Sequence, residues 1–268
     1  MSDIPTRRYR IVVEYDGSDF VGWQLQPNGR SVQGALEQAL QKLFSASVRI
    51  HGAGRTDAGV HATGQVAHFD IDRDLDGDTM ARALNAELPP DVTVHRAAQV
   101  ADDFHARFSA SSRSYCYTIA HGRNSLHRRT QWMLYAGIDH DAIRQSIPCL
   151  RGTHDFTTFS KLMPDMEHHY CHVFDAAWEQ DGEITRFHIR ANRFLHGMVR
   201  CLVGGLVQVG RRKLSPEGFA QLLALRDRGH APMLAPPQGL VLTRVGYDSA
   251  DWETVQAIMD RLRSAENG

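Results

Sequence analysis

Residues 8–100 switch between two kinds of apolar spacing, and the order of the switches limits the folds open to this chain. Residues 8–15 are rich in β-branched and aromatic side chains, which predicts a strand. Residues 32–44 carry apolar side chains at helical spacing after Ser31, a residue type that commonly caps helices. The other elements predicted here are strands over 48–51, 65–71 and 92–100 and a helix over 78–86. The resulting order of strand, helix, strand, strand, helix and strand is the ferredoxin-like arrangement.

The rest of the chain shows the same two spacings with more insertions. A strand is predicted over 113–120, a hairpin around Asp181-Gly182, and a helix that starts at Ser215-Pro216. The remaining predictions are strands over 131–136, 173–178, 184–191 and 240–247 and helices over 139–150, 194–209 and 252–262. We therefore expect an α+β protein with two ferredoxin-like (RRM-like) halves, residues 1–105 and 106–268. Their mainly antiparallel sheets would be joined side by side, with helices on one face.

Length and composition are those of an ordinary globular chain. The 268 residues are 42% hydrophobic and 23% charged, which excludes collagen-like, disordered and membrane classes. The four cysteines are widely scattered without a CxxC pair, so we expect reduced thiols. The first residues lack the apolar core of a signal peptide, and the stretch 198–209 is too short and polar to cross a membrane. We expect a cytoplasmic protein.

The distribution of charge is more informative than its sum of -1. Acidic residues are absent between Asp103 and Asp139 and again between Glu183 and Glu217, while arginines occur throughout both tracts. Two basic tracts in a neutral chain suggest a surface for a phosphate backbone. The alternative is that these arginines are simply solvated on helix and strand faces.

The loop before residue 61 carries the most conspicuous carboxylate of the chain. Gly52, Gly54 and Gly59 allow positive φ and close approach of another backbone. Asp57 follows Arg55 and Thr56, and a neighbouring guanidinium favours an ionised carboxylate, which suits a nucleophile or a base. The alternative is a turn in which Asp57 caps backbone N–H groups. A phosphate-binding P-loop is excluded because no Gly-Lys-Ser/Thr ending follows.

The run Gly54-Arg55-Thr56-Asp57-Ala58-Gly59-Val60-His61 resembles the most specific motif of the tRNA pseudouridine synthase A family. Tyr15-Asp16-Gly17 and the following 20–24 resemble the first-strand motif of that family. Further matches follow in order at 103–108, 113–117, 155–157, 194–200 and 239–242. The resemblance therefore covers nearly the whole chain.

The resemblance implies an isomerase that converts uridines 38, 39 and 40 of the tRNA anticodon stem-loop into pseudouridine, with no cofactor and no metal. Asp57 would be the catalytic carboxylate, either attacking carbon or removing the 2′ proton toward a glycal. Arg200 would pair with Asp57, the alternative being an arginine at the rim of a helix. Tyr115 would be catalytic as well as substrate-binding, with its ring stacked on uracil and its hydroxyl near C5, where a proton must leave, the alternative being a core tyrosine on an alternating strand.

The remaining implied site residues bind the substrate. Arg55 would hold the flipped nucleotide or fill its place in the stack, since extrusion of a base costs a few kcal/mol. Leu240 or Leu242, with Leu242 preferred, would form an apolar floor, and only one of the two is expected to face the pocket. The family further implies a homodimer and an active site in the cleft between the halves, with the Asp57 loop in the first half and Tyr115 and Arg200 in the second.

The segment Phe104-His105-Ala106-Arg107-Phe108 mixes aromatic rings with a cation, which suits stacking on RNA bases and contact with phosphates. By resemblance it would bind RNA, although some of its members would be core, Phe108 first among them.

This chain departs from the family pattern at 160–172, where two acids and several histidines replace the basic segment that is usual in the family. Adjacent residues of an extended segment point to opposite faces, so His168, His169, Cys171 and His172 are not expected to hold a metal.

Two other functions compete with the isomerase. A non-catalytic RNA-binding module would explain the basic tracts and the aromatic residues, but not the presence of Arg55, Asp57, Tyr115 and Arg200 together. A glycosidase normally needs two facing carboxylates, and the sequence offers no convincing partner for Asp57.

Overall fold

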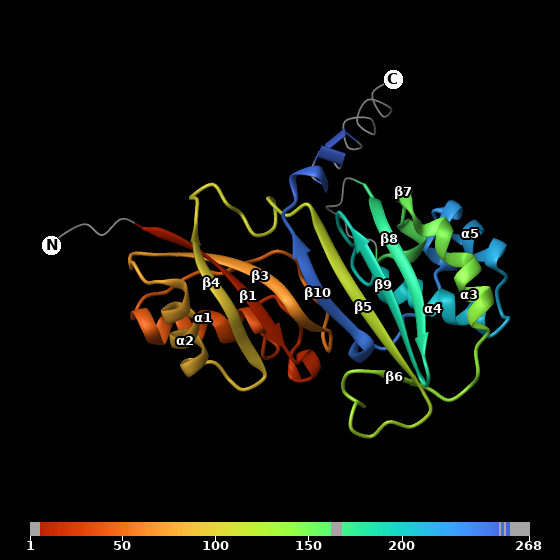
Figure 1. Ribbon diagram of the computed structural model, residues 1–268, viewed down its shortest axis with the longest axis horizontal. Coiled ribbons are helices and arrows are strands. Elements are labelled where there is room, and N and C mark those ends of the chain that lie inside the picture. Colours follow the sequence, from red (N-terminus) through yellow and green to blue (C-terminus); the bar gives the residue numbers. More distant parts are fainter. Residues whose placement is uncertain (1–5, 162–167, 252, 255, 258–268) are drawn as a thin grey trace. The chain divides into compact units, whose positions relative to one another are not determined.

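The computed structural model describes residues 6–161, 168–251, 253–254 and 256–257 (Figure 1). The described chain divides into two compact units. The first unit contains the residues up to Ala110 together with Leu242–Val245, and the second contains the rest from Ser111 on. The boundary between the units therefore lies a few residues after the predicted division between residues 105 and 106. The segment Leu242–Val245 also belongs to the first unit. Both units mix strands and helices, so the protein is of the α+β class.

The first unit follows the predicted order of elements. Its helices are α1 (Val32–Phe44) and α2 (Gly77–Glu87), and its strands are β1 (Arg7–Tyr15), β2 (His51–Gly52), β3 (His61–Ile71) and β4 (Val92–Val100). The strands pair antiparallel in the order β4-β1-β3, with β2 beside β3. Strand β2 is shorter than the predicted 48–51, and β3 begins before the predicted residue 65. A short 3-10 helix, η1 (Gly17–Asp19), follows β1.

One face of this sheet is covered by the two helices (Figure 1). Tyr9, Ile11 and Val13 of β1 are fully buried and alternate with more exposed residues, as the strand period of two requires. Leu36 of α1 and Leu84 of α2 are fully buried as well. Local caps set the ends of the helices: the Ser31 hydroxyl accepts the Gly34 N–H at the start of α1, as predicted, and Asp76 caps α2 in the same way.

The second unit contains a sheet of order β5-β9-β8-β7, with β6 parallel to β5. Its strands are β5 (Ser112–His121), β6 (Trp132–Leu134), β7 (Gly152–Asp155), β8 (Tyr170–Asp181) and β9 (Ile184–Ala191), and its helices are α3 (His140–Ser146), α4 (Met198–Gly210) and α5 (Pro216–Leu225). The 3-10 helices are η2 (Ile147–Leu150), η3 (Thr157–Phe159), η4 (Arg228–His230) and η5 (Pro237–Gly239). Strand β10 (Leu240–Gly246) is shared between the units.

Several predicted boundaries in the second unit were wrong, each for a local reason. Helix α4 begins at Met198 instead of 194, because Gly197 has a φ of 73° in the left-handed region and interrupts the helix. Helix α3 ends at Ser146 and continues as η2, where Pro148 lacks the N–H that an α-helix needs. Strand β7 was not predicted. The helix expected over 252–262 lies largely outside the described residues.

Helix α4 forms the core of the second unit. Cys201, Leu202 and Leu206 on this helix are fully buried. A Cβ on Gly204 would lie 1.8 Å from the carbonyl oxygen of Met233, so glycine is needed for this close approach. All four cysteines are free, and burial raises the pKa of the Cys201 thiol to about 11. Among the described residues, the helices lack the combined length and apolar character needed to span a bilayer.

Candidate active site

Asp57 lies in the loop between β2 and β3 of the first unit. Asp57 is half-buried, its neighbour Arg55 is exposed, and Thr56 between them is buried. The loop therefore presents a carboxylate and a guanidinium while the residue between them turns into the protein. This arrangement requires contacts that hold the loop from inside.

A buried hydrogen-bond network below the loop supplies part of that support. The hydroxyl of Tyr15 at the end of β1 lies 2.8 Å from the Thr56 hydroxyl. The side-chain amide of Gln65 on β3 donates to the Gly54 carbonyl at 2.9 Å and to the Tyr15 hydroxyl at 3.5 Å. Burial raises the pKa of Tyr15 to about 12, so its hydroxyl stays protonated at neutral pH. The strands β1 and β3 thus fix the backbone on both sides of Arg55.

The segment after η1 clamps the same loop through its backbone. The Trp23 N–H donates to the Thr56 carbonyl at 3.1 Å, and the Gly59 N–H donates to the Phe20 carbonyl at 3.4 Å. Gly22 has a φ of 112°, and a Cβ there would lie 2.6 Å from the Thr56 carbonyl oxygen. Only glycine satisfies both conditions. The matches at 20–24 therefore have a physical role, which is to press against the Asp57 loop.

The far end of the loop is fixed by His61. Its Nδ1 accepts the Gly17 N–H at 3.0 Å and lies 3.1 Å from an Asp16 carboxylate oxygen. A Cβ on Gly17 would lie 2.0 Å from the Val60 carbonyl oxygen. The 15–17 motif therefore closes on the end of the loop. The supporting roles of Tyr15, Gly17 and Gln65 were not predicted from the sequence, because they depend on contacts between distant segments.

In the second unit, Tyr115 lies on β5 opposite Ile189 of β9. Its side chain is 8% exposed and meets the Phe194 ring edge to face, with centroids 5.0 Å apart. The neighbouring inward tyrosine, Tyr117, is fully buried and donates its hydroxyl to the Pro236 carbonyl at 2.7 Å. Burial raises the pKa of Tyr117. Tyr115 is therefore the more accessible of the two rings, and Tyr117 anchors the segment before β10.

Arg200 lies in the first turn of α4 and is half-buried. Its Nε donates to the Ala235 carbonyl at 2.8 Å, while its own carbonyl accepts the Ala235 N–H at 3.0 Å. The guanidinium is thus oriented by a backbone partner. Leu240 and Leu242 of β10 are 6% and 0% exposed. The expectation that only one of them can face a pocket was wrong, because residues two apart on a strand point to the same side.

The predicted RNA-contacting segment runs over the first unit after β4. Ala106 is fully buried and donates its N–H to Nδ1 of His68 at 3.1 Å, so its side chain supports the segment and is not available to RNA. Arg8 donates to the Phe104 carbonyl at 3.0 Å. The expectation that Phe108 is a core residue was wrong, because its side chain is 65% exposed. His105 and Arg107 are half-buried and exposed, respectively.

The histidine-rich segment falls partly outside the described residues, which resume at 168. Cys171 is 1% exposed, whereas His172 turns the other way and lies 2.9 Å from the Thr153 hydroxyl through Nδ1. The two residues therefore point to opposite faces, as predicted for an extended segment. Over the described ranges, no three His, Cys, Asp or Glu side chains are grouped as metal ligands.

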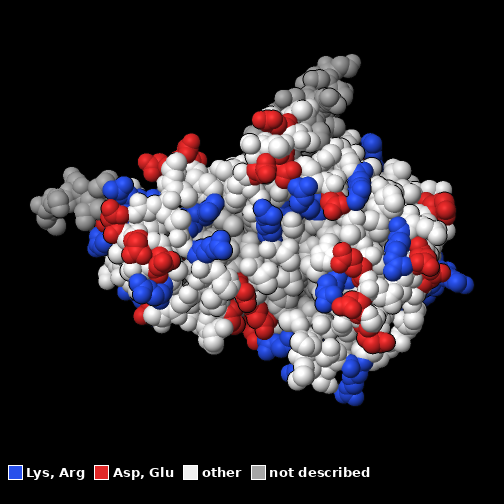
Figure 2. Space-filling model, viewed as in Figure 1, with Lys and Arg blue, Asp and Glu red and all other residues white. Residues whose placement is uncertain are grey.

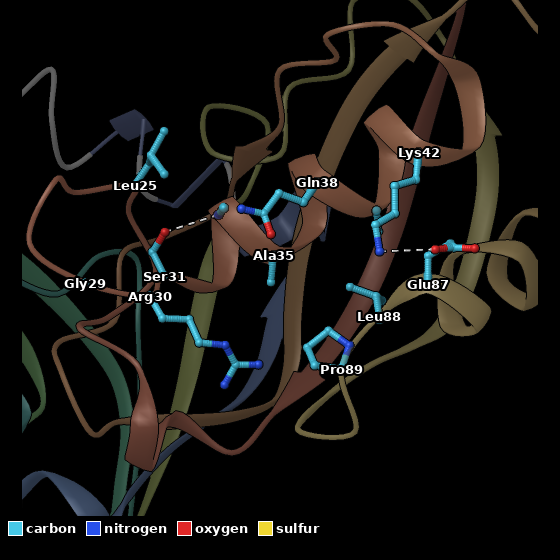
Figure 3. Close-up of a pocket in the computed structure, with 12 residues that line it drawn as sticks. Leu25, Gly29, Arg30, Ser31, Ala35, Gln38, Lys42, Glu87, Leu88 and Pro89 are labelled. Atoms are coloured by element: carbon cyan, nitrogen blue, oxygen red, sulfur yellow. Dashed lines mark hydrogen bonds and ion pairs between the residues drawn. The ribbon is translucent and has the colours of Figure 1, made fainter.

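The first unit also contains a cavity of about 330 Å³ on its helical side (Figure 3). It is lined by Leu25 and residues 29–31 before α1, by α1 itself, and by residues 87–89. Its cations have acidic partners: Arg30 pairs with Asp91 at 2.5 Å, and Lys42 with Glu87 at 3.4 Å. None of the predicted site residues lines this cavity, so it is separate from the Asp57 loop.

Comparison with known proteins accounts for this arrangement of motifs. A model of the tRNA pseudouridine synthase family matches residues 11–109 and 148–248. Proteins named tRNA pseudouridine synthase A are similar over most of their length: that of Bacteroides thetaiotaomicron is 43% identical over 96% of this chain and 97% of its own, and that of Methylocella silvestris is 44% identical over 91% and 99%.

A solved Cbf5-Nop10-Gar1 complex is also similar, at 13% identity and a TM-score of 0.36 over 87% of this chain and 57% of the other. The family match and the relatives are sufficient: the chain belongs to the tRNA pseudouridine synthase family, whose members are isomerases that act on tRNA.

Proposed function

We propose that this protein converts uridines at positions 38, 39 and 40 of the tRNA anticodon stem-loop into pseudouridine, with Asp57 as the catalytic carboxylate. The observation that carries the proposal is the support of the Asp57 loop. Tyr15, Gln65 and the backbone around Gly22 hold this loop, and its half-buried Asp57 follows an exposed arginine. A carboxylate fixed on a rigid sheet suits a reaction that needs one group placed accurately.

The reaction breaks the N1–C1′ bond of uridine and forms a C5–C1′ bond after the base has turned over. The C5 proton leaves, N1 gains a proton, and no electrons are gained or lost overall. Asp57 would act at the sugar, either by attack on C1′ or by removal of the 2′ proton. Neither route needs a redox group or a transferred phosphate.

The remaining proposed residues orient Asp57 or hold the base. Arg200 would pair with Asp57, and its Nε–H bond to the Ala235 carbonyl orients the guanidinium, whose planar fork suits a carboxylate. Tyr115 would stack on uracil, which its contact with Phe194 supports because that contact fixes the tilt of the ring. The exposed Arg55 would hold the flipped nucleotide, and Leu242 would contribute an apolar floor.

The two units would be ferredoxin-like, a view supported in the first unit by the antiparallel order β4-β1-β3-β2 and by its two helices. The protein would act as a cytoplasmic homodimer that binds one tRNA across two subunits. Sedimentation of the purified protein tests the dimer, because a monomer at the concentrations used in assays would contradict it.

Release of tritium from tRNA labelled at uracil C5 tests the proposed chemistry, because the C5 proton must leave. We expect release by the wild-type protein and none by Asp57→Asn, with tRNA binding retained. Asp72→Asn is the matched control, since Asp72 is an exposed carboxylate in the same unit that pairs with Arg73 at 3.2 Å. Wild-type release by Asp57→Asn would refute the catalytic role of Asp57.

Mapping of pseudouridine in the product tests the positions separately. We expect modification at 38, 39 and 40 in wild-type tRNA, and its loss at each position where uridine is replaced by cytidine. Modification confined to other parts of the tRNA would overturn the anticodon assignment while leaving the isomerase activity intact.

A further inference from the structure

Three histidine rings from three segments meet on the face of the first-unit sheet opposite the helices. His51 of β2 and His68 of β3 are directly paired across the strands, and their rings stack with centroids 5.1 Å apart. The ring of His105, from the segment after β4, lies 4.6 Å from that of His68 and 5.8 Å from that of His51. The three imidazoles therefore form a continuous cluster.

Phenylalanine rings extend this cluster toward solvent. The Phe108 ring lies 4.4 Å from the His105 ring, and the Phe104 ring meets His68 edge to face at 6.2 Å. Phe108 is 65% exposed and His51 is exposed, whereas His68 beneath them is 2% exposed. Exposure of large aromatic rings to water is unfavourable. Packing within the first unit therefore does not explain why the Phe108 and His51 rings lie at the surface above the buried His68 ring.

Hydrogen bonds keep two of these imidazoles neutral. Nδ1 of His68 accepts the Ala106 N–H at 3.1 Å, and Nδ1 of His105 accepts the N–H groups of Arg107 and Phe108 at 3.2 and 3.3 Å. An imidazole nitrogen that accepts an N–H carries no proton, so the hydrogen of each ring is on Nε2. Burial, the two other histidines and Arg8 lower the pKa of His68 to about 4. The rings of His68 and His105 are therefore neutral at physiological pH.

Arginine side chains lie next to the rings of the cluster. The Arg107 guanidinium lies 5.5 Å from the centre of the Phe108 ring, and that of Arg10 lies 5.9 Å from the centre of Phe104. Arg10 is paired with His68 across the strands and therefore lies on the same face of the sheet, as does Arg96 of β4. Figure 2 shows basic side chains over β1 and β4 on this face. An aromatic surface with cations at its edge matches a base joined to a phosphate backbone.

We propose that His51, His105 and Phe108 form a stacking site for one unpaired nucleobase of the bound RNA, with Arg107 directed at an adjacent phosphate. The site rests on the proposed function, because it takes RNA as the substrate, but it lies outside the catalytic loop. It adds His51, a residue that the sequence did not single out, to the segment 104–108. The His51 ring contributes as an aromatic surface for stacking.

Equilibrium binding of a full-length tRNA transcript to the whole protein tests this site. We expect His51→Ala and Phe108→Ala each to weaken binding about fivefold or more, the range measured for removal of one stacked aromatic residue. His51→Phe retains a ring and is expected to bind within about twofold of wild type, by the same stacking argument. His95→Ala is the matched control: this half-exposed histidine lies on β4 of the same unit and pairs with Glu14 at 2.7 Å. Wild-type binding by both alanine variants, or equal weakening by His51→Phe and His51→Ala, would overturn the proposal.

The salt dependence of binding separates stacking from phosphate contact. A residue that contributes only by stacking changes affinity without changing the number of counterions released, so the slope of log K against log salt should be unchanged in His51→Ala and Phe108→Ala. Arg107→Ala should reduce that slope by about one. A reduced slope in His51→Ala would show that this side chain contributes through a phosphate contact and would contradict a role in stacking alone.

These measurements remain informative if the proposed chemistry is wrong. Loss of tRNA binding in the alanine variants together with no tritium release by the wild type would disprove the isomerase and support the base site. Tritium release by the wild type with unchanged binding in both alanine variants would support the isomerase and disprove the base site. In an active enzyme, His51→Ala should raise KM and leave kcat unchanged, because the base site does not touch the reacting uridine.

Discussion

The hydroxyl of Tyr15 lies 2.8 Å from the hydroxyl of Thr56, one residue before Asp57. Both side chains are buried, and Gln65 joins them through its bonds to Tyr15 and to the Gly54 carbonyl. The end of the first strand of the chain thus determines where the proposed catalytic carboxylate is held. This relationship makes the loop sensitive to changes in residues that are themselves remote from the substrate.

Tyr15→Phe should both destabilise the protein and reduce its activity. The change removes a hydroxyl and leaves the buried Thr56 hydroxyl without this partner, which costs about 1–3 kcal/mol. Denaturant unfolding should show the loss, and tritium release should show a lower kcat because the loop is less well held. Tyr135→Phe is the control, since Tyr135 is 74% exposed. Equal stability and activity of Tyr15→Phe and wild type would show that the network does not support the loop.

Gly22→Ala should be among the more damaging single changes to the first unit. Alanine is strained at a φ of 112°, and its Cβ would lie 2.6 Å from the Thr56 carbonyl oxygen, so the Asp57 loop would have to shift. We expect a loss of more than about 1 kcal/mol in the free energy of unfolding. Gly137→Ala is the matched control, because a Cβ there meets no atom within 4 Å and the backbone φ is not positive. Similar unfolding curves for the two variants would contradict this account.

Arg200→Lys should lower kcat much more than it changes KM. Lysine keeps the charge but loses the planar fork, so it cannot bond to the Ala235 carbonyl through Nε and hold a carboxylate at the same time. Steady-state tritium release provides both constants. Arg211→Lys serves as the control because Arg211 is an exposed arginine at the end of the same helix. An unchanged kcat in Arg200→Lys would argue that Arg200 does not orient Asp57.

Acid should destabilise the first unit through His68. Burial and the neighbours His105, His51 and Arg8 lower the pKa of His68 from 6.5 in the unfolded chain to about 4, while Asp70 opposes this shift weakly. The unfolded state therefore binds this proton first, so the contribution of His68 to stability is present above pH 6.5 and is lost as the pH falls toward 4.

His68→Asn provides the comparison for that pH dependence. Asparagine does not titrate, and its side-chain oxygen can accept the Ala106 N–H that now bonds to Nδ1 of His68. Unfolding free energies measured between pH 7.5 and pH 4.5 should fall less steeply for His68→Asn than for the wild type. Parallel pH profiles for the two proteins would exclude His68 as the source of the effect.

Local physical chemistry of the sequence determined most of the elements of this protein. Strand β1, helix α1 with its Ser31 cap, helix α5 after Ser215-Pro216 and the turn at Gly182 were all predicted, because each depends on spacing or on a cap within a few residues. The Asp57 motif was also visible in the sequence, and the family match confirms the class of enzyme that it indicated.

Contacts between distant segments decided the rest. Tyr15 is 41 residues from Thr56 and 50 from Gln65, so their network leaves no local pattern in the sequence. Phe108 is of a residue type that is common in cores, yet most of its surface is not covered by the described chain. His51 is part of an aromatic cluster because β2 pairs with β3. Periodicity reports which side of an element is apolar, whereas the exposure of a side chain and the partners of a loop depend on which other segments pack against it.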